Sequence, residues 1–258
     1  GNGRDGSHST TAGFSASNFD TGPVERAAGD HARTRPRAEG DDAVVPDAFT
    51  GTLAGYQFDG VRWMLEQLGN RGGCVLADEP GLGKTAQALA VVSTLVARGA
   101  TRVLVVAPAH VLKVWAAEAA KFVEVDGARG AFRIVVAADP SSERVAVKSL
   151  VTAEKLFAKL ADSPAAPLVV AMSYGQVQLH GQGFAVSGAT LDALVLDEAH
   201  RVKNASSQTA AAVAQLPSRR HLLLSATPLS NELEELRAVN EGARAATAGP
   251  TAAPAAPG

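Results

Sequence analysis

The residues best suited to chemistry lie in one stretch of the sequence, Asp78-Glu-Pro-Gly81-Leu-Gly83-Lys84-Thr85. Glycines at positions 81 and 83 allow consecutive backbone N–H groups to converge on phosphate oxygens, where a Cβ would hold the ligand away. In such a loop Lys84 would reach the β- and γ-phosphates of ATP, and the Thr85 hydroxyl would bind Mg²⁺. The loop departs from the general pattern at Asp78, where glycine is usual. An ordinary glycine-rich turn is the alternative interpretation.

A second chemical pattern, Asp197-Glu198-Ala-His200, follows an apolar run at residues 191–196. Two adjacent carboxylates repel each other unless a cation or a proton lies between them. Asp197 would therefore hold Mg²⁺, through water, and Glu198 would orient and deprotonate an attacking water. The alternative is a chance acidic pair at the start of a helix. Because this box and the Gly-x-Gly-Lys-Thr loop together fix eight positions, their coincidence by chance is on the order of 10⁻⁵ at about 7% usage per residue type.

Two further sets of polar residues fit the same chemistry. The side-chain amide of Gln57 donates and accepts at once, which matches the edge of an adenine ring. Ser225 and Thr227 follow the apolar run 221–224, and hydroxyl groups at a strand end can hydrogen-bond to carboxylates on a neighbouring strand. These two residues would then sense whether the acidic pair holds a γ-phosphate.

Strands and helices must position these groups, and the sequence predicts an alternation of the two. Apolar runs typical of buried strands occupy residues 74–77, 101–107, 132–137, 168–172, 191–196 and 221–224. Helical periodicity occupies residues 53–68, 85–98, 108–122, 146–160 and 231–239. In the first of these helices we expect Trp63, Met64 and Leu68 to be packing residues. The alternation implies an α/β fold, a parallel sheet with helices on both faces and ligands at the carboxyl ends of the strands.

Composition narrows the class of protein. Of the 258 residues, 46% are hydrophobic, which is enough for a sizeable core, and the formal net charge of −2 creates no global basic field for nucleic acid. The single cysteine, Cys74, excludes a disulfide framework and a multi-thiol zinc site. The sequence contains no signal segment and no apolar run of membrane-spanning length. We expect a cytoplasmic protein, associated with the nucleoid if the source is bacterial.

The two ends of the chain differ from its centre in composition. Residues 1–48 are rich in Gly, Ser, Thr, Asp and Arg, and this composition predicts a disordered tail. Its arginines are interleaved with acidic residues, so a solvated tail is favoured over a polyanion-binding one. Residues 241–258 form a second low-complexity tail of Ala, Thr, Gly and Pro. One folded domain is therefore expected over residues 49–240.

In this order the motifs resemble the first RecA-like lobe of the Swi/Snf-type ATPases, within the superfamily-two helicases and translocases. The resemblance covers roughly residues 49 to 239 and is most specific in the Asp-Glu-x-Gly-Leu-Gly-Lys-Thr form of the loop, since the family carries aspartate at position 78. The matching stretches are Tyr56-Gln57 through Trp63, Asp78 to Thr85, Val105 through Trp115, Met172-Ser-Tyr174, Asp197 to Asn204, and Leu222 through Leu236.

The resemblance implies roles for residues on both the nucleotide side and the DNA side. Gln57 would contact adenine, and the loop and the acidic pair would act as described above. His200 and residues 225–227 would couple the state of ATP to DNA. Residues around Pro108 to Lys113, together with Ser173 and Tyr174, would lie along a phosphate backbone, with little readout of bases.

The resemblance also implies ATP-driven translocation on duplex DNA. In this family ATP lies between two lobes, and an arginine finger contributes about 10³–10⁵ in rate. Because the sequence carries the motifs of one lobe, we expect nucleotide binding but weak or no hydrolysis without a second RecA-like lobe, supplied in cis or in trans. Ser225-Ala-Thr227 resembles the helicase form more than the Swi/Snf form, and Arg237 stands where tryptophan is usual.

Two other interpretations remain open. The chain is a truncated, non-catalytic module that binds ATP or DNA, or it is a fragment of an RNA helicase. The Ser-Ala-Thr form favours the second, whereas Trp63 and the Asp-Glu-Pro-Gly-Leu-Gly context of the loop oppose it.

Overall fold

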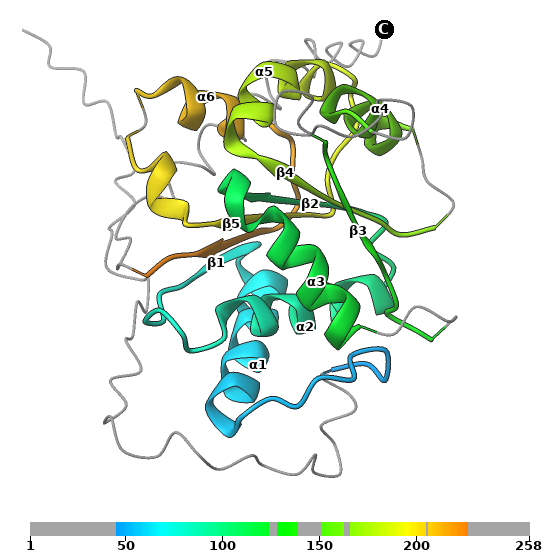
Figure 1. Cartoon of the computed structure of the whole chain (residues 1–258), viewed down its shortest axis with the longest axis vertical. Coiled ribbons are helices and arrows are strands. Elements are labelled where there is room, and N and C mark those ends of the chain that lie inside the picture. The colour runs from blue at the N-terminus through cyan, green and yellow to red at the C-terminus, as the bar shows by residue number, and fades with distance from the viewer. Residues whose placement is uncertain (1–44, 124–127, 139–150, 163–165, 205, 227–258) are drawn as a thin grey trace, which may run out of the picture.

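The computed structural model describes residues 45–123, 128–138, 151–162, 166–204 and 206–226 (Figure 1). The predicted tails lie largely outside these ranges, as do Thr227, the helix predicted over 231–239 with its Arg237, and the first part of the helix predicted over 146–160. Residues 45–48, which the sequence places in the N-terminal tail, are described, and Val45 and Ala48 are buried. The backbone N–H of Thr50 donates to the Phe122 carbonyl at 2.8 Å, so this segment packs against the domain.

Six strands form one parallel sheet. The strands are β1 (Gly73–Leu76), β2 (Arg102–Ala107), β3 (Ile134–Val136), β4 (Leu168–Ser173), β5 (Ala193–Asp197) and β6 (His221–Leu224). Their order across the sheet is β1-β6-β5-β2-β4-β3, and every neighbouring pair is parallel. Each predicted strand is present, and the parallel sheet that their alternation with helices implies is confirmed.

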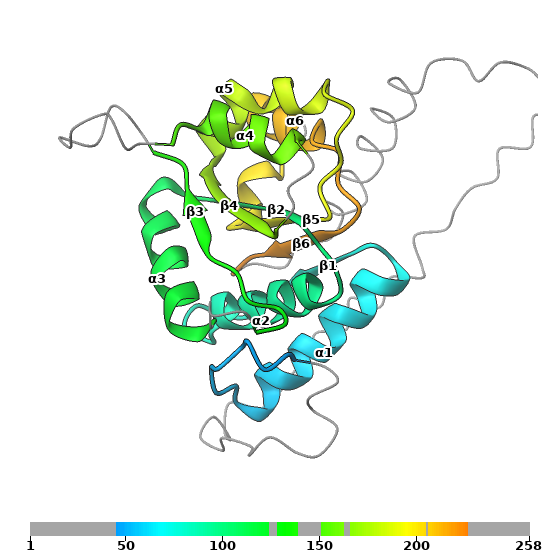
Figure 2. The ribbon, with the colours of Figure 1, turned by 90° about the vertical axis from the view of Figure 1, so that its right-hand side faces the viewer.

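Helices cover both faces of this sheet. They are α1 (Gly55–Asn70), α2 (Lys84–Ala97), α3 (Leu112–Phe122), α4 (Ala153–Ala161), α5 (Tyr174–Ala185) and α6 (Gln208–Ala214), with 3₁₀ turns η3 (Ala109–Val111) and η5 (Ala199–Val202). Figure 2 shows α1, α2 and α3 on one side of the sheet and α4, α5 and α6 on the other. A hydrophobic core lies on each face of the sheet, and β2 contributes side chains to both. Val103 and Val105 pack with the first set of helices, and Leu104 and Val106 pack with the second. Since successive side chains of a strand point to opposite faces, a strand buried on both must be apolar throughout.

Two helices and one packing residue differ from the sequence prediction. Helices α5 and α6 were not predicted, although α5 begins with a capping box in which the Ser173 hydroxyl accepts from the Gln176 N–H at 3.2 Å and the Ser173 N–H donates to Gln176 Oε1 at 2.8 Å. Three glycines within α5 lower its helix propensity and hide it from periodicity. The prediction that Trp63 packs with Met64 and Leu68 is wrong, because Trp63 is 37% exposed whereas the other two are buried.

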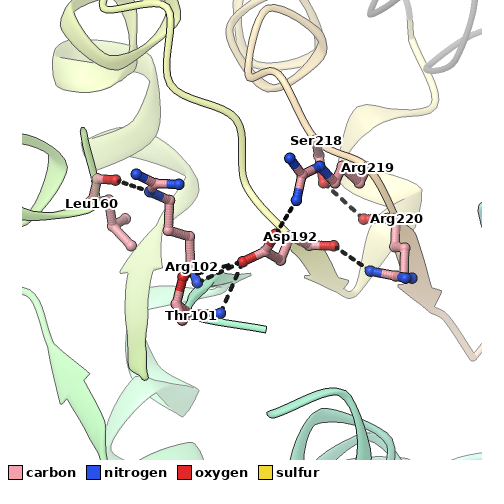
Figure 3. Close-up of polar contacts among 7 residues, drawn as sticks. All are labelled: Thr101, Arg102, Leu160, Asp192, Ser218, Arg219 and Arg220. Carbon is pink, nitrogen blue, oxygen red and sulfur yellow. Dashed lines mark hydrogen bonds and ion pairs between the residues drawn. The ribbon is translucent and has the colours of Figure 1, made fainter. Parts of the chain in front are cut away.

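The amino ends of β2, β5 and β6 are tied together by one buried carboxylate, Asp192 (Figure 3). Its Oδ2 accepts from the backbone N–H groups of Thr101 (2.8 Å) and Arg102 (3.0 Å), and its Oδ1 accepts from Arg219 Nη1 at 2.8 Å. The Asp192 carbonyl accepts from Arg220 Nη1 at 3.5 Å. A buried charge with this many donors is compensated, so this edge of the sheet is fixed while the opposite edge carries the chemical motifs.

Within the described ranges, no helix combines the length and the apolar character that crossing a membrane requires.

Candidate functional site

The strand order brings the two chemical motifs to one edge of the sheet. Leu224 at the end of β6 pairs with Leu76 at the end of β1 and with Asp197 at the end of β5. The loop that follows β1 and the acidic pair that follows β5 therefore flank Ser225, which is fully buried and donates its N–H to the Leu76 carbonyl at 3.0 Å. The carboxyl edge of a parallel sheet is where such folds bind ligands.

The loop after β1 has a backbone geometry that suits an anion. Gly81 and Gly83 have φ of 89° and 76°, the left-handed region that glycine adopts without strain. Gly83 is the N-cap of the 14-residue helix α2 and provides no side-chain cap. Among the described residues, no acceptor contacts the N–H groups of Lys84, Thr85 or Ala86. These three donors and the positive end of the helix dipole fit a bound phosphate.

Lys84 lies across this loop. Its Nζ donates to the carbonyls of Asp78 at 2.6 Å and Glu79 at 3.0 Å, which leaves one of its three hydrogens for a ligand. Burial raises the pKa of the Asp197 carboxyl, and the Lys84 charge acts against this rise. Because β1 and β5 end on either side of β6, the structure brings the loop that carries Lys84 and the acidic pair to one edge of the sheet.

The aspartate at position 78 has a structural role in the loop. Its Oδ2 accepts from Gln87 Nε2 at 2.9 Å, and Gln87 is 1% exposed. The same amide lies 3.4 Å from the Leu82 carbonyl. The departure from glycine at this position is explained, because the carboxylate joins the loop to the first turn of α2. Gln87 was not identified from the sequence.

Helix α1 docks on the same loop through Gln57 and Tyr56. Gln57 Nε2 donates to the Leu82 carbonyl at 3.1 Å, and its Oε1 accepts from the Ala54 N–H at 2.9 Å. The Tyr56 hydroxyl donates to the same Leu82 carbonyl at 3.3 Å. One donor and one acceptor position of the Gln57 amide remain, and its contact with adenine stays a prediction.

Asp197 is held by three groups. Its Oδ2 accepts from Trp115 Nε1 at 2.8 Å, its Oδ1 accepts from the Glu198 N–H at 3.0 Å, and its carbonyl accepts from the Tyr174 hydroxyl at 2.7 Å. Burial raises the pKa of the Asp197 carboxyl, the hydrogen bond from Trp115 opposes this, and the Glu198 charge adds to it. A partly buried anion beside a second carboxylate favours a bound cation.

Glu198 adopts a strained backbone. Its φ of 53° and ψ of 51° lie in the left-handed region, and it is the only residue other than glycine with positive φ in the part of the chain that the structure describes. Such a conformation costs of order 1–3 kcal/mol and occurs preferentially at functional sites. The side chain forms a 3.2 Å contact with His200 Nδ1, and both side chains remain accessible, at 38% and 48% exposed respectively.

The remaining predicted residues lie farther along the same edge. Ala107 pairs with Ser173 across β2 and β4, so Pro108, which precedes η3, and Ser173, the N-cap of α5, end neighbouring strands. Lys113 is exposed on the first turn of α3. The Ser173 hydroxyl caps its helix and retains its own hydrogen as a donor.

The donor set fits a magnesium ion held jointly with phosphate. Mg²⁺ prefers oxygen ligands and is usually bound by one or two carboxylates together with substrate phosphates. The Asp197 carboxylate and the Thr85 hydroxyl are such ligands. Within the described ranges, no group of three or more His, Cys, Asp or Glu side chains could hold a metal ion by itself.

Comparison with known proteins identifies the family. The model of the SNF2-related domain matches residues 56–240. The chain belongs to this family. The SNF2 domain is 35% identical over 187 residues to the DNA repair and recombination protein RAD54 of Oryza sativa subsp. japonica, covering 70% of the chain and 17% of that protein. It is 33% identical over 199 residues to Protein CHROMATIN REMODELING 25 of Arabidopsis thaliana, covering 72% of the chain and 20% of that protein.

A solved structure agrees with this assignment. The SWI2/SNF2 ATPase core of Sulfolobus solfataricus in complex with dsDNA superposes with a TM-score of 0.55 at 26% identity, covering 75% of this chain and 36% of that core. The resemblance to the first RecA-like lobe of the Swi/Snf-type ATPases is confirmed. The SNF2 domain described here spans about a third of that core and about a fifth of the curated relatives.

The sequence did not reveal the two buried side chains that hydrogen-bond to Asp197. Trp115 and Tyr174 occur in motifs that carried the resemblance; no role was predicted for Trp115, and Tyr174 was expected along a phosphate backbone, whereas it is buried and its hydroxyl donates to the Asp197 carbonyl. A buried indole or phenol needs a hydrogen-bond partner, which is a usable signal, but neither side chain reveals its partner. Trp115 finds that partner 82 positions away.

Proposed function

We propose that this SNF2 domain binds ATP with magnesium at the carboxyl edge of its sheet and, within a complete enzyme, hydrolyses it to move along duplex DNA. The observation that supports this most strongly is the strand register that brings Lys84, the N–H groups at the start of α2 and the Asp197-Glu198 pair to one edge of the sheet. Membership of an ATPase family and the described neighbour bound to dsDNA are consistent with it.

Each residue has a distinct part in the proposed reaction. The α2 N–H groups and Lys84 bind the β- and γ-phosphates, and Gln57 binds adenine. Thr85 and Asp197 would hold magnesium, which would supply positive charge against the phosphates. A water oxygen attacks the γ-phosphorus, the bond from that phosphorus to the β,γ-bridging oxygen breaks, and ADP leaves with the electron pair. Glu198 takes the proton of the attacking water.

Rapid hydrolysis is proposed to need a second lobe, in cis or in trans. The chain covers 36% of the Sulfolobus core, and we assign to the remainder of such a core the arginine that stabilises the transferring phosphoryl group. The first lobe alone then binds ATP but turns it over slowly.

The DNA backbone is proposed to run along the other half of the same edge. Pro108, Lys113 and Ser173 end or follow β2 and β4, next to the nucleotide half formed by β1, β6 and β5. Ser225 follows β6 within the nucleotide half, and His200 follows β5, the strand next to β2; these two residues would couple the two halves. Contacts of this kind are with phosphates, so binding should be insensitive to sequence and should weaken with salt.

A pair of lysine variants tests the proposal. A fluorescent ATP analogue with magnesium should bind the chain, and Lys84→Ala should weaken this binding at least tenfold. Lys113→Ala is the matched control, since it removes a lysine from the proposed DNA half; it should keep nucleotide binding and lose affinity for duplex DNA. Wild-type protein that fails to bind the analogue, or equal binding by Lys84→Ala, would overturn the proposal.

A further inference from the structure

A buried hydrogen bond joins helix α3 to the acidic pair. Trp115 is 1% exposed, packs in the core between α3 and the sheet, and donates its indole N–H to Asp197 Oδ2 at 2.8 Å. Tryptophan has one polar hydrogen and accepts no hydrogen bonds. Its only polar group is therefore committed to the carboxylate that the proposed function assigns to magnesium.

This bond restricts the orientation of the Asp197 carboxylate. One oxygen accepts from Trp115 and the other from the Glu198 N–H, while Tyr174 fixes the backbone through the Asp197 carbonyl. Each carboxylate oxygen accepts two hydrogen bonds or ligands, so one position on each remains. Rotation of the carboxylate about its Cβ–Cγ bond would break both hydrogen bonds at once.

We propose that Trp115 is a positioning residue for metal binding: its indole N–H orients the Asp197 carboxylate so that the remaining lone pairs face the ion that accompanies ATP. This inference rests on the proposed function, because it assumes that Asp197 binds the ion. Groups that hydrogen-bond to a metal ligand fix its orientation, and removing one typically costs ten- to a hundredfold in metal affinity.

Trp115→Phe separates this role from core packing. Phenylalanine keeps an aromatic ring in the core and removes the donor. Nucleotide binding is measured with the fluorescent ATP analogue while magnesium is titrated. The variant should need about ten- to a hundredfold more magnesium for half-maximal binding, whereas binding in the presence of a chelator should equal that of wild type. Trp63→Phe is the matched control, since Trp63 is the partly exposed tryptophan of α1, and it should keep the wild-type magnesium dependence.

A double-mutant comparison tests whether the effect passes through the carboxylate. In the Asp197→Asn background, Trp115→Phe should change the magnesium dependence by less than twofold. A tenfold effect in that background would overturn the inference, because Trp115 would then act on the site by another route.

Tryptophan fluorescence provides a readout that does not need the Trp115 variant to fold. The chain contains two tryptophans, so Trp63→Phe leaves Trp115 as the only one. Magnesium with ATP should shift the emission of Trp115, and ATP with a chelator should not. The Asp197→Asn variant should show no magnesium-dependent shift. Unchanged emission on saturation with magnesium and ATP would overturn the inference.

The outcomes separate this inference from the function on which it rests. If wild-type protein shows no magnesium-dependent binding of ATP, both fail. If wild type and Trp63→Phe bind in a magnesium- and Lys84-dependent manner but a folded Trp115→Phe protein has the same magnesium requirement, only the positioning role fails. If Trp115→Phe does not fold, the emission of Trp115 in the Trp63→Phe protein decides.

Discussion

Replacing Gly83 with alanine tests whether Gln57 anchors the loop that follows β1. A Cβ at position 83 would clash with Gln57 Nε2, on a backbone with φ of 76°. Gly81 is a matched control: its φ is 89°, but among the described residues outside its chain neighbours nothing lies within 4 Å of the corresponding Cβ. Both substitutions strain the backbone, and only Gly83→Ala displaces the glutamine amide.

The two variants should differ by the energy of one hydrogen bond. An alanine forced into the left-handed region costs about 1–2 kcal/mol, and this cost is common to both. Displacing Gln57 also breaks the 3.1 Å hydrogen bond to the Leu82 carbonyl, which contributes about 0.5–1.5 kcal/mol. The free energy of unfolding should fall by about 1–2 kcal/mol for Gly81→Ala and about 1.5–3.5 kcal/mol for Gly83→Ala.

Urea unfolding of both variants, in the wild-type and the Gln57→Ala backgrounds, measures this difference. Truncating Gln57 removes the clashing atom, so the gap between the two alanine variants should close in that background. Equal destabilisation in the wild-type background, or a gap that persists without the glutamine side chain, would refute the reasoning that Gln57 packs against the loop.

Three further predictions concern other parts of the domain. Asp192→Ala leaves two backbone N–H groups without their acceptor and should lower the free energy of unfolding by about 2–5 kcal/mol; Asp162→Ala, at an exposed position, should change it by less than about 0.5 kcal/mol in the same urea experiment. Burial raises the pKa of Tyr174, so its contribution to stability is complete below the ordinary tyrosine pKa of about 10 and is lost as pH rises above it. The free energy of unfolding of Tyr174→Phe should therefore fall less steeply than that of wild type as the pH rises above about 10, and an unchanged slope would contradict this. Glu198→Gln should bind ATP with magnesium as wild type does but lose about 10²–10⁴ in hydrolysis when assayed with a second lobe and duplex DNA, and unchanged turnover would remove Glu198 from the role of base.

Local patterns in the sequence predicted the strands and the loop well. A strand buried on both faces is a short apolar run, and all six such runs became strands within two or three residues of the predicted ends. This uniformly apolar composition does not indicate the order of the strands in the sheet, because nothing in an apolar run specifies which strand it pairs with. The arrangement β1-β6-β5-β2-β4-β3 could not be read from these runs.

The sequence alone determined which groups can do the chemistry: Lys84 and the glycines of the loop, and the Asp197-Glu198 pair. These are contiguous motifs, and their residue types define what they can bind. Only the tertiary structure decided how they are supported. Trp115 hydrogen-bonds to Asp197, 82 residues away. Gln57 of helix α1 hydrogen-bonds to Leu82 in the loop before α2. Asp192 joins the amino ends of three strands, at the edge of the sheet opposite the motifs. A buried hydrogen-bond donor in the sequence requires an acceptor, but the packing of the sheet decides which acceptor lies within 3 Å of it.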